Sequence, residues 1–76
     1  MTENQKLDLK IEKQTKLAGY YATNLSLYLE ELKEVQDQIK KENKDYMIEM
    51  YKAKEKNIKK SIKDLDQNFK KELMEI

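Results

Sequence analysis

The chain has 76 residues, of which 41% are charged, and it contains no Arg, His, Cys, Trp or Pro. Without Cys it forms no disulfide, and without His or Cys it lacks the usual ligands of zinc, haem and iron–sulfur clusters. Catalysis would have to rest on carboxylates, Lys, Tyr or Ser alone, so we expect neither an enzyme nor a cofactor. This composition favours a role in binding.

The overall charge is nearly balanced, because 16 lysines face 15 acidic residues and leave a net charge of +1. No global field therefore draws the chain to nucleic acid or anionic lipid. The longest uncharged stretch, residues 17–29, is too short to span a bilayer, and residues 1–6 do not resemble a signal peptide. We expect a cytoplasmic protein without a membrane partner. Lys to the exclusion of Arg, together with the small size, suggests an AT-rich phage or plasmid gene.

Apolar residues in the first half recur at alternating steps of four and three, the spacing of a heptad seam. This first seam consists of Leu7, Ile11, Gln14, Ala18, Tyr21, Leu25, Tyr28, Leu32, Val35 and Ile39. A second seam consists of Ile48, Tyr51, Glu55, Ile58, Ile62, Leu65, Phe69, Glu72 and Ile76. Both patterns predict helices, because a half-buried strand would show strict alternation instead.

The two seams are out of phase. The nine residues from Ile39 to Ile48 rotate the apolar stripe by about half a turn at about 100° per residue. A reversal of the chain lets both seams face each other, and the polar run at residues 40–45 is the natural place for it. Asn43 or Asp45 is the expected N-cap of the second helix.

The sequence thus predicts an all-α fold, a helical hairpin of two long antiparallel helices in one domain. We expect helices at about residues 4–42 and 46–75, with a turn at about 43–45. The alternative is a three-helix bundle with a break near Gly19, which could end one helix while Asn24 caps the next.

The first predicted helix carries further apolar residues beside its seam: Leu9, Leu17, Tyr20 and Leu27, with Leu29 nearby. An apolar arc this wide suits a helix with two neighbours. A lone hairpin also buries too little apolar surface to offset the entropy of ordering its residues. We therefore expect two hairpins to form a four-helix bundle as a homodimer, or one hairpin to bind a different protein.

Residues 17–32 hold three of the five tyrosines, a residue type favoured at interfaces for its large rigid contact area and polar tip. The residues that we expect to contact a protein partner are Leu17, Tyr20, Leu27 and Tyr28. Tyr28 could equally fill a seam position. This interpretation makes the chain a small protein-binding regulator, inhibitor or assembly factor.

Lysines gather on one face of the second predicted helix, within about 60° on a helical wheel. The candidate phosphate-binding residues in this row are Lys52, Lys56, Lys59 and Lys63, with Lys70 further along. The alternative function is therefore a dimer that binds RNA or DNA through this row. No Arg and no aromatic residue accompanies the lysines, so a solvated helix face is the simpler interpretation.

Acidic residues also cluster at helical spacing, at Glu30, Glu31, Glu34 and Asp37. They lie off the seam and have no His beside them, so we expect no metal site. Four acids precede a lysine by four residues and should form ion pairs: Glu12 with Lys16, Asp37 with Lys41, Glu55 with Lys59, and Asp66 with Lys70.

Overall fold

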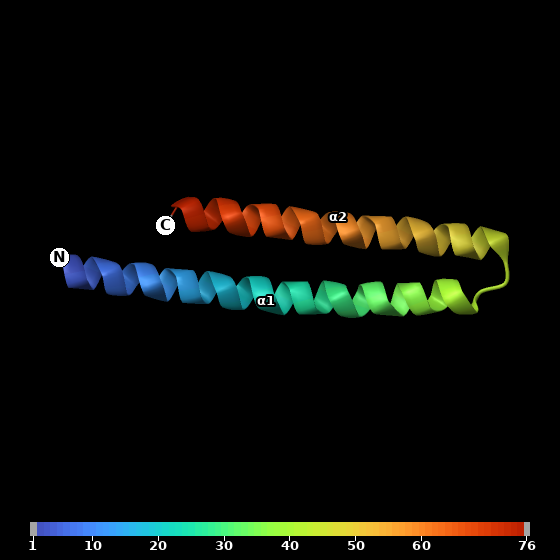
Figure 1. Cartoon of the computed structure of the whole chain (residues 1–76), viewed down its shortest axis with the longest axis horizontal. Coiled ribbons are helices and arrows are strands. Elements are labelled where there is room, and N and C mark those ends of the chain that lie inside the picture. Colours follow the sequence, from blue (N-terminus) through green and yellow to red (C-terminus); the bar gives the residue numbers. More distant parts are fainter. Residues whose placement is uncertain (1, 76) are drawn as a thin grey trace.

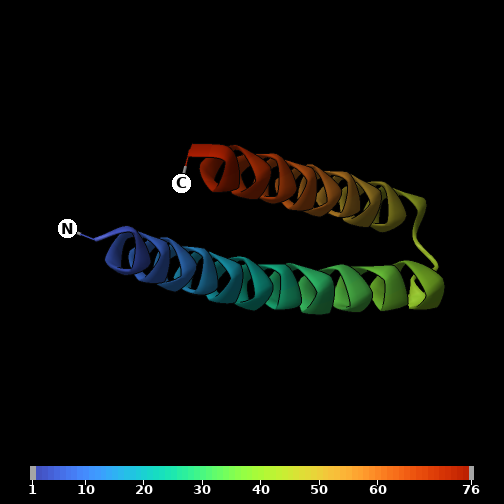
Figure 2. The ribbon, with the colours of Figure 1, turned by 60° about the vertical axis from the view of Figure 1, so that its left-hand side comes forward.

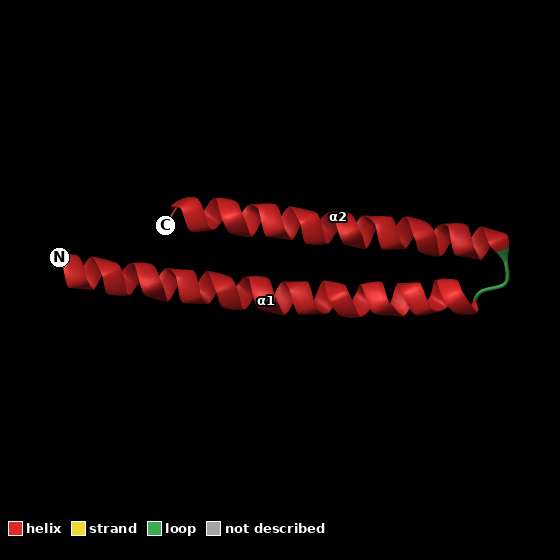
Figure 3. Ribbon diagram, in the orientation of Figure 1, coloured by secondary structure: helices red, strands yellow, loops and turns green. Residues whose placement is uncertain are grey.

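The computed structural model describes residues 2–75 as two helices, α1 (Glu3–Lys41) and α2 (Asp45–Glu75), joined by a short connection (Figures 1 and 3). The helices run antiparallel and lie side by side in two views (Figures 1 and 2). Residues 2–75 contain no strand. The predicted helical hairpin is confirmed, and its association into a four-helix bundle stays a prediction.

α1 begins with a capping box. The Thr2 hydroxyl accepts a hydrogen bond from the Gln5 backbone N–H at 3.3 Å, and the Gln5 side chain accepts one from the Thr2 N–H at 3.0 Å. Two backbone donors that the first turn leaves free are thereby satisfied. This cap starts the helix one residue earlier than expected.

α1 passes through Gly19 without a break, so the three-helix alternative is wrong. The hydroxyl of Thr23 donates to the Gly19 carbonyl oxygen at 2.9 Å, and the Asn24 amide donates to the Tyr20 carbonyl oxygen at 2.8 Å. Asn24 therefore bonds within the helix rather than capping a new one. One Gly destabilises a helix interior by only about 1 kcal/mol, which the packing of a 39-residue helix absorbs.

The connection between the helices is organised by the Glu42 side chain. Its carboxylate accepts hydrogen bonds from the backbone N–H groups of Asn43 and Lys44, at 3.0 and 3.1 Å. The Lys44 carbonyl oxygen then accepts from Met47 and Ile48, which places Lys44 at the N-cap in place of the expected Asn43 or Asp45. Asp45 is instead the first residue of α2, where its charge favours the helix dipole. Glu42 thus orders a turn that contains neither Gly nor Pro.

The interface between the helices follows the predicted seams, except that the early seam residues of α1 do not face α2. Val35 is the most enclosed apolar side chain, at 8% exposed, while Leu7, Ile11 and Ala18 of the predicted seam are exposed. A strict heptad stripe drifts by about 20° per heptad around a straight helix, so its early members turn away from α2. Leu17 lies off the predicted seam but is half-buried, and it takes the position at the interface with α2 that was predicted for Ala18.

The hairpin is long and thin, with principal extents of 64 × 16 × 9 Å and a radius of gyration of 18.3 Å. A compact domain of this length would have a radius of gyration of about 11 Å. α1 has 39 residues and α2 has 31, and the N-terminal end of α1 extends past the end of α2 (Figure 1). Leu7 and Ile11 therefore lack cover from α2 as well as being rotated away from it.

Candidate protein-binding surface

Three of the four residues predicted to contact a partner lie together on one flank of the hairpin. Tyr20 is 66% exposed and Leu27 is 54% exposed, and Leu17 is half-buried beside Tyr20 in a shallow hollow. Leu9 lies eleven residues before Tyr20, which is close to three full turns, and is 41% exposed. We call Leu9, Leu17, Tyr20 and Leu27 the Tyr20 surface.

Tyr28, the fourth predicted contact, lies elsewhere. It is half-buried, and at about 100° per residue it shares the face of α1 that holds Tyr21 and Leu32 against α2. Its ring therefore belongs to the interface between the helices, the alternative that the sequence left open. Tyr28 does not contribute to the Tyr20 surface.

A second apolar area lies on the opposite flank of α1. Ala22, Leu25 and Leu29 line a shallow hollow there, together with the polar residues Ser26, Glu30 and Lys33. Leu29 is 49% exposed and is separated from Leu27 by about 200° around the helix, so it does not extend the Tyr20 surface as its sequence position suggested. We call Ala22, Leu25 and Leu29 the Leu29 surface.

A polar contact between the helices at Tyr21 was not predicted from the heptad pattern. Its ring stacks on Phe69 with centroids 4.4 Å apart, and its hydroxyl donates to Asp66 Oδ1 at 3.2 Å. Asp66 Oδ2 also pairs with Lys70 Nζ at 3.0 Å. The hydrogen bond from Lys70, followed by that from Tyr21, holds the pKa of the Asp66 carboxyl below its usual range. Partial burial, followed by the hydrogen bond to Asp66, raises the pKa of Tyr21.

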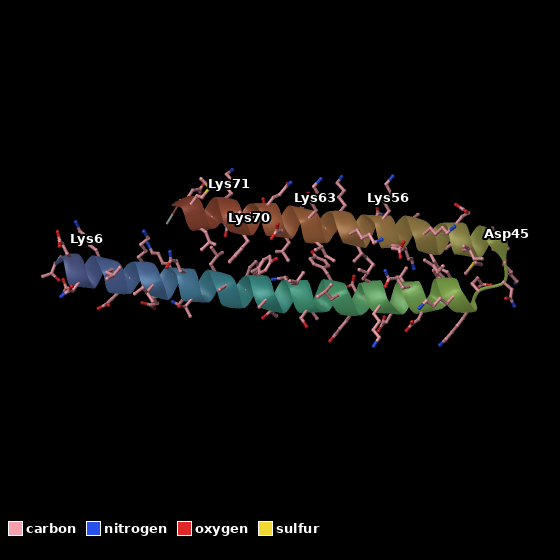
Figure 4. All side chains as sticks on the ribbon, viewed as in Figure 1. Lys6, Asp45, Lys56, Lys63, Lys70 and Lys71 are labelled. Carbon is pink, nitrogen blue, oxygen red and sulfur yellow. The ribbon has the colours of Figure 1, made fainter. Side chains whose placement is uncertain are left out.

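The predicted lysine row is exposed along α2. Figure 4 shows Lys56 and Lys63 pointing away from α1, with Lys71 on the same outer side. Lys59 pairs with Glu55 at 3.7 Å, whereas no carboxylate of the described residues lies within 4.0 Å of Lys52, Lys56 or Lys63. The seam position of Glu55 is thus compatible with its charge, because the carboxylate reaches out to Lys59. Asp37 and Lys41 form no ion pair, unlike the three other predicted pairs.

The Tyr20 surface and the lysine row lie on opposite flanks of the hairpin. The hollow beside Leu17 and Tyr20 is completed by Glu72 and Glu75 of α2. Further along the same flank, a second hollow joins Glu31 and Glu34 of α1 to Lys54 and Asn57 of α2. These four α2 positions are roughly half a turn from the lysine row around the helix. The Tyr21–Asp66–Lys70 contact lies on the lysine side.

Within residues 2–75, no three acidic side chains are grouped so that they could hold a metal ion. In the same part of the chain, neither helix has a stretch apolar and long enough for a membrane span. The arrangement offers two apolar surfaces and one basic row as candidate contact surfaces.

No protein-family model matches this chain, and no curated protein or solved structure is significantly similar to it.

Proposed function

We propose that the protein acts by association: it forms a homodimer of hairpins that binds a partner protein as a regulator, inhibitor or assembly factor. In this proposal it has no enzymatic activity and works in the cytoplasm. The observation that carries the proposal is the amount of surface that one hairpin leaves uncovered, on which several large apolar side chains are exposed.

The hairpin exposes 6396 Å² for a mass of 9.2 kDa. A compact monomer of that mass exposes about 4,900 Å², so this chain carries an excess of about 1,500 Å². A stable protein interface removes about 800 Å² from each partner. The excess is therefore nearly twice what one such interface needs.

The exposed apolar side chains are distributed in a way that supports two contacts. Those of α1 are Leu7, Leu9, Ile11, Tyr20, Leu27 and Leu29, and those of α2 are Tyr46, Met50 and Met74. Patches of this kind on a soluble chain commonly mark interaction sites. With the Tyr20 surface on one flank and the Leu29 surface on the other, one can serve the homodimer while the other binds the partner protein.

The test is the double variant Tyr20→Ala with Leu27→Ala, compared with Leu29→Ala and the native chain. We expect the native chain to be dimeric by light scattering and to retain a chemically crosslinked partner when recovered from its host. The double variant should lose one of these two properties while keeping its helical circular dichroism. Retention of both properties would contradict the proposal.

The second candidate function is binding of RNA or DNA by the lysine row. It is favoured by one observation, the absence of carboxylate partners for Lys52, Lys56 and Lys63 among the described residues. A dimer would present two such rows, and point charges can follow a phosphate backbone. Balanced overall charge and the absence of Arg make it the weaker candidate.

Fluorescence anisotropy with labelled RNA and DNA at increasing salt tests this second function. Binding by the row should weaken steeply with salt and be abolished by Lys56→Glu with Lys63→Glu. The matched control is Lys10→Glu with Lys33→Glu, which makes the same change in net charge on α1. Equal loss in both pairs, or no binding at 50 mM salt, would eliminate the row as a nucleic-acid site.

A further inference from the structure

We infer that the Tyr20 surface binds the Tyr20 surface of a second copy, with the two α1 helices antiparallel and crossing near residue 18. This inference rests on the proposed homodimer and specifies which residues meet in it. The occupant is a second copy because the excess exposed area of the hairpin is sufficient for a dimer interface, and because the apolar and charged residues of this surface are complementary to themselves about a two-fold axis.

The apolar residues of this surface are arranged almost symmetrically about Ala18. Leu9 lies nine residues before it and Leu27 nine residues after it, and Leu17 and Tyr20 lie one before and two after. When two copies of α1 run antiparallel about this point, Leu9 faces Leu27 of the second copy and Leu17 faces its Tyr20. A two-fold axis makes each of these contacts twice.

The charged residues on this face fit the same register. Lys6 lies twelve residues before Ala18 and Glu31 thirteen residues after it, so Lys6 of each copy faces Glu31 of the other. Neither residue forms an ion pair with another described residue of its own chain. Lys13 faces Asn24 in this arrangement. Opposite charges placed in this way set the register and select the partner.

The arrangement also accounts for the length of α1. Its N-terminal turns, marked by Lys6 in Figure 4, extend past α2 and lack a neighbour, yet they contain the exposed Leu9. In the antiparallel pair this end lies along residues 23–31 of the second copy. The extension that α2 leaves uncovered thus becomes half of the interface.

A homodimer formed through the opposite flank would be less stable. The Leu29 surface adjoins the side of the hairpin that carries the lysine row, so two copies joined through that flank would bring two rows of like charge together. Like charges held close across an interface oppose binding. On the Tyr20 surface, the lysines beside Leu17 and Tyr20 are accompanied by acids: Lys16 pairs with Glu12 at 3.1 Å, and Glu72 and Glu75 of α2 line the same hollow as Lys13 and Lys16.

Cysteine crosslinking tests the register, because the native chain has no Cys. Chains carrying Leu9→Cys are mixed with chains carrying Leu27→Cys and oxidised mildly. We expect a disulfide-linked dimer, since residues that face each other across a helix pair can come within the Cα separation of about 4.4–6.8 Å that a disulfide needs. Leu9→Cys alone should not crosslink, because two copies of residue 9 lie about 27 Å apart in this register.

The matched control replaces Leu27→Cys with Leu29→Cys, a position of similar exposure on the other flank. It should crosslink to Leu9→Cys at least tenfold more slowly. Equal or faster crosslinking to Leu29→Cys overturns the inference while leaving the homodimer intact. A native chain that sediments as a monomer at all concentrations overturns the homodimer itself, so the two failures are distinguishable.

Charge reversal provides a second test that needs no Cys. Lys6→Glu and Glu31→Lys should each weaken the dimer by about fivefold, since two exposed ion pairs are lost, and the double variant should recover native affinity. Lys33→Glu, on the other flank, should have little effect. Failure of the double variant to recover affinity contradicts the register.

Discussion

The Tyr21 hydroxyl donates a hydrogen bond to the Asp66 carboxylate across the hairpin, at 3.2 Å. Among the described residues it is the one side-chain hydrogen bond that joins α1 to α2. Stacking of the same ring on Phe69 adds a second specific contact at this level. An apolar heptad seam alone tolerates sliding by one heptad, whereas this pair is satisfied in one register, so we assign it the role of fixing the alignment of the helices.

Tyr21→Phe should therefore lower the free energy of unfolding by a small but measurable amount, because it removes the hydrogen bond and keeps the ring. Tyr21→Leu should lower it further, since the stack on Phe69 is lost as well. Urea denaturation followed by circular dichroism measures both. If Tyr21→Phe matches the native stability, the hydrogen bond does not contribute to the hairpin.

The pH dependence of the Asp66→Asn variant should show which protonation state matters. The pKa of Asp66 is lowered in the fold by Lys70 and Tyr21, so its contribution is present above the ordinary Asp pKa of about 4 and is lost as the pH falls through the lowered value. The stability difference between native and Asp66→Asn chains should thus shrink below about pH 4. A difference that stays constant from pH 7 to pH 2 would contradict this assignment.

The contribution of Tyr21 to stability should depend on pH in the opposite sense to that of Asp66. Its pKa is raised in the fold, so its contribution is present below the ordinary value of about 10 and is lost as the pH rises through the raised value. The difference between native and Tyr21→Phe chains should therefore diminish in strongly alkaline solution. Ultraviolet titration of the native chain beside Tyr21→Phe checks the shift, because the ionisation that the variant lacks should occur above the ordinary pKa of about 10.

Glu42→Ala should destabilise the hairpin by about 1 kcal/mol or more, because the Asn43 and Lys44 backbone N–H groups lose their acceptor. Glu42→Gln is the matched control, since its amide oxygen can accept the same bonds. Thermal unfolding of both variants measures the difference. Equal destabilisation by Ala and Gln would show that the charge, and not the pair of hydrogen bonds, orders the turn.

Gly19→Ala should stabilise α1 by about 1 kcal/mol, because the helix is continuous there and a Cβ at residue 19 meets no atom within 4 Å. Ala22→Gly, three residues later on the same exposed side, should destabilise by a similar amount. Urea denaturation of the two variants tests the pair. A destabilising Gly19→Ala would mean that another chain occupies the open space beside Gly19.

The hairpin itself was predictable from the sequence because the phase shift between Ile39 and Ile48 admits few other solutions. The exact interface was not, since a strict heptad count places Ile11 and Ala18 toward α2, whereas the drift of a straight helix brings Leu17 there instead. Thr2 and Gln5 form a recognisable capping-box signature that would have placed the start of α1 correctly. The role of Glu42 depends on local hydrogen bonds within the turn, and that of the Tyr21–Asp66 pair depends on how the two helices are aligned. A heptad pattern contains neither.

Among the residues predicted to contact a partner, Tyr20 and Leu27 are exposed, whereas Tyr28 is half-buried. The distinction depends on which side of a broad apolar arc faces α2, and a helical wheel alone leaves both sides equivalent. The same reasoning places Leu29 on the opposite flank from Leu27, although the two are only two residues apart. The wide apolar arc of α1 indicated association. The packing of α2 against the middle of this arc divides it into the Tyr20 surface and the Leu29 surface.

The most direct test of association through the Tyr20 surface is sedimentation equilibrium of the native chain beside the Tyr20→Ala, Leu27→Ala double variant. We expect the native chain to sediment at twice its mass of 9.2 kDa and the double variant to shift toward 9.2 kDa at the same concentration. A native chain that remains at 9.2 kDa up to millimolar concentration, or a double variant that dimerises as tightly as the native chain, would contradict the account.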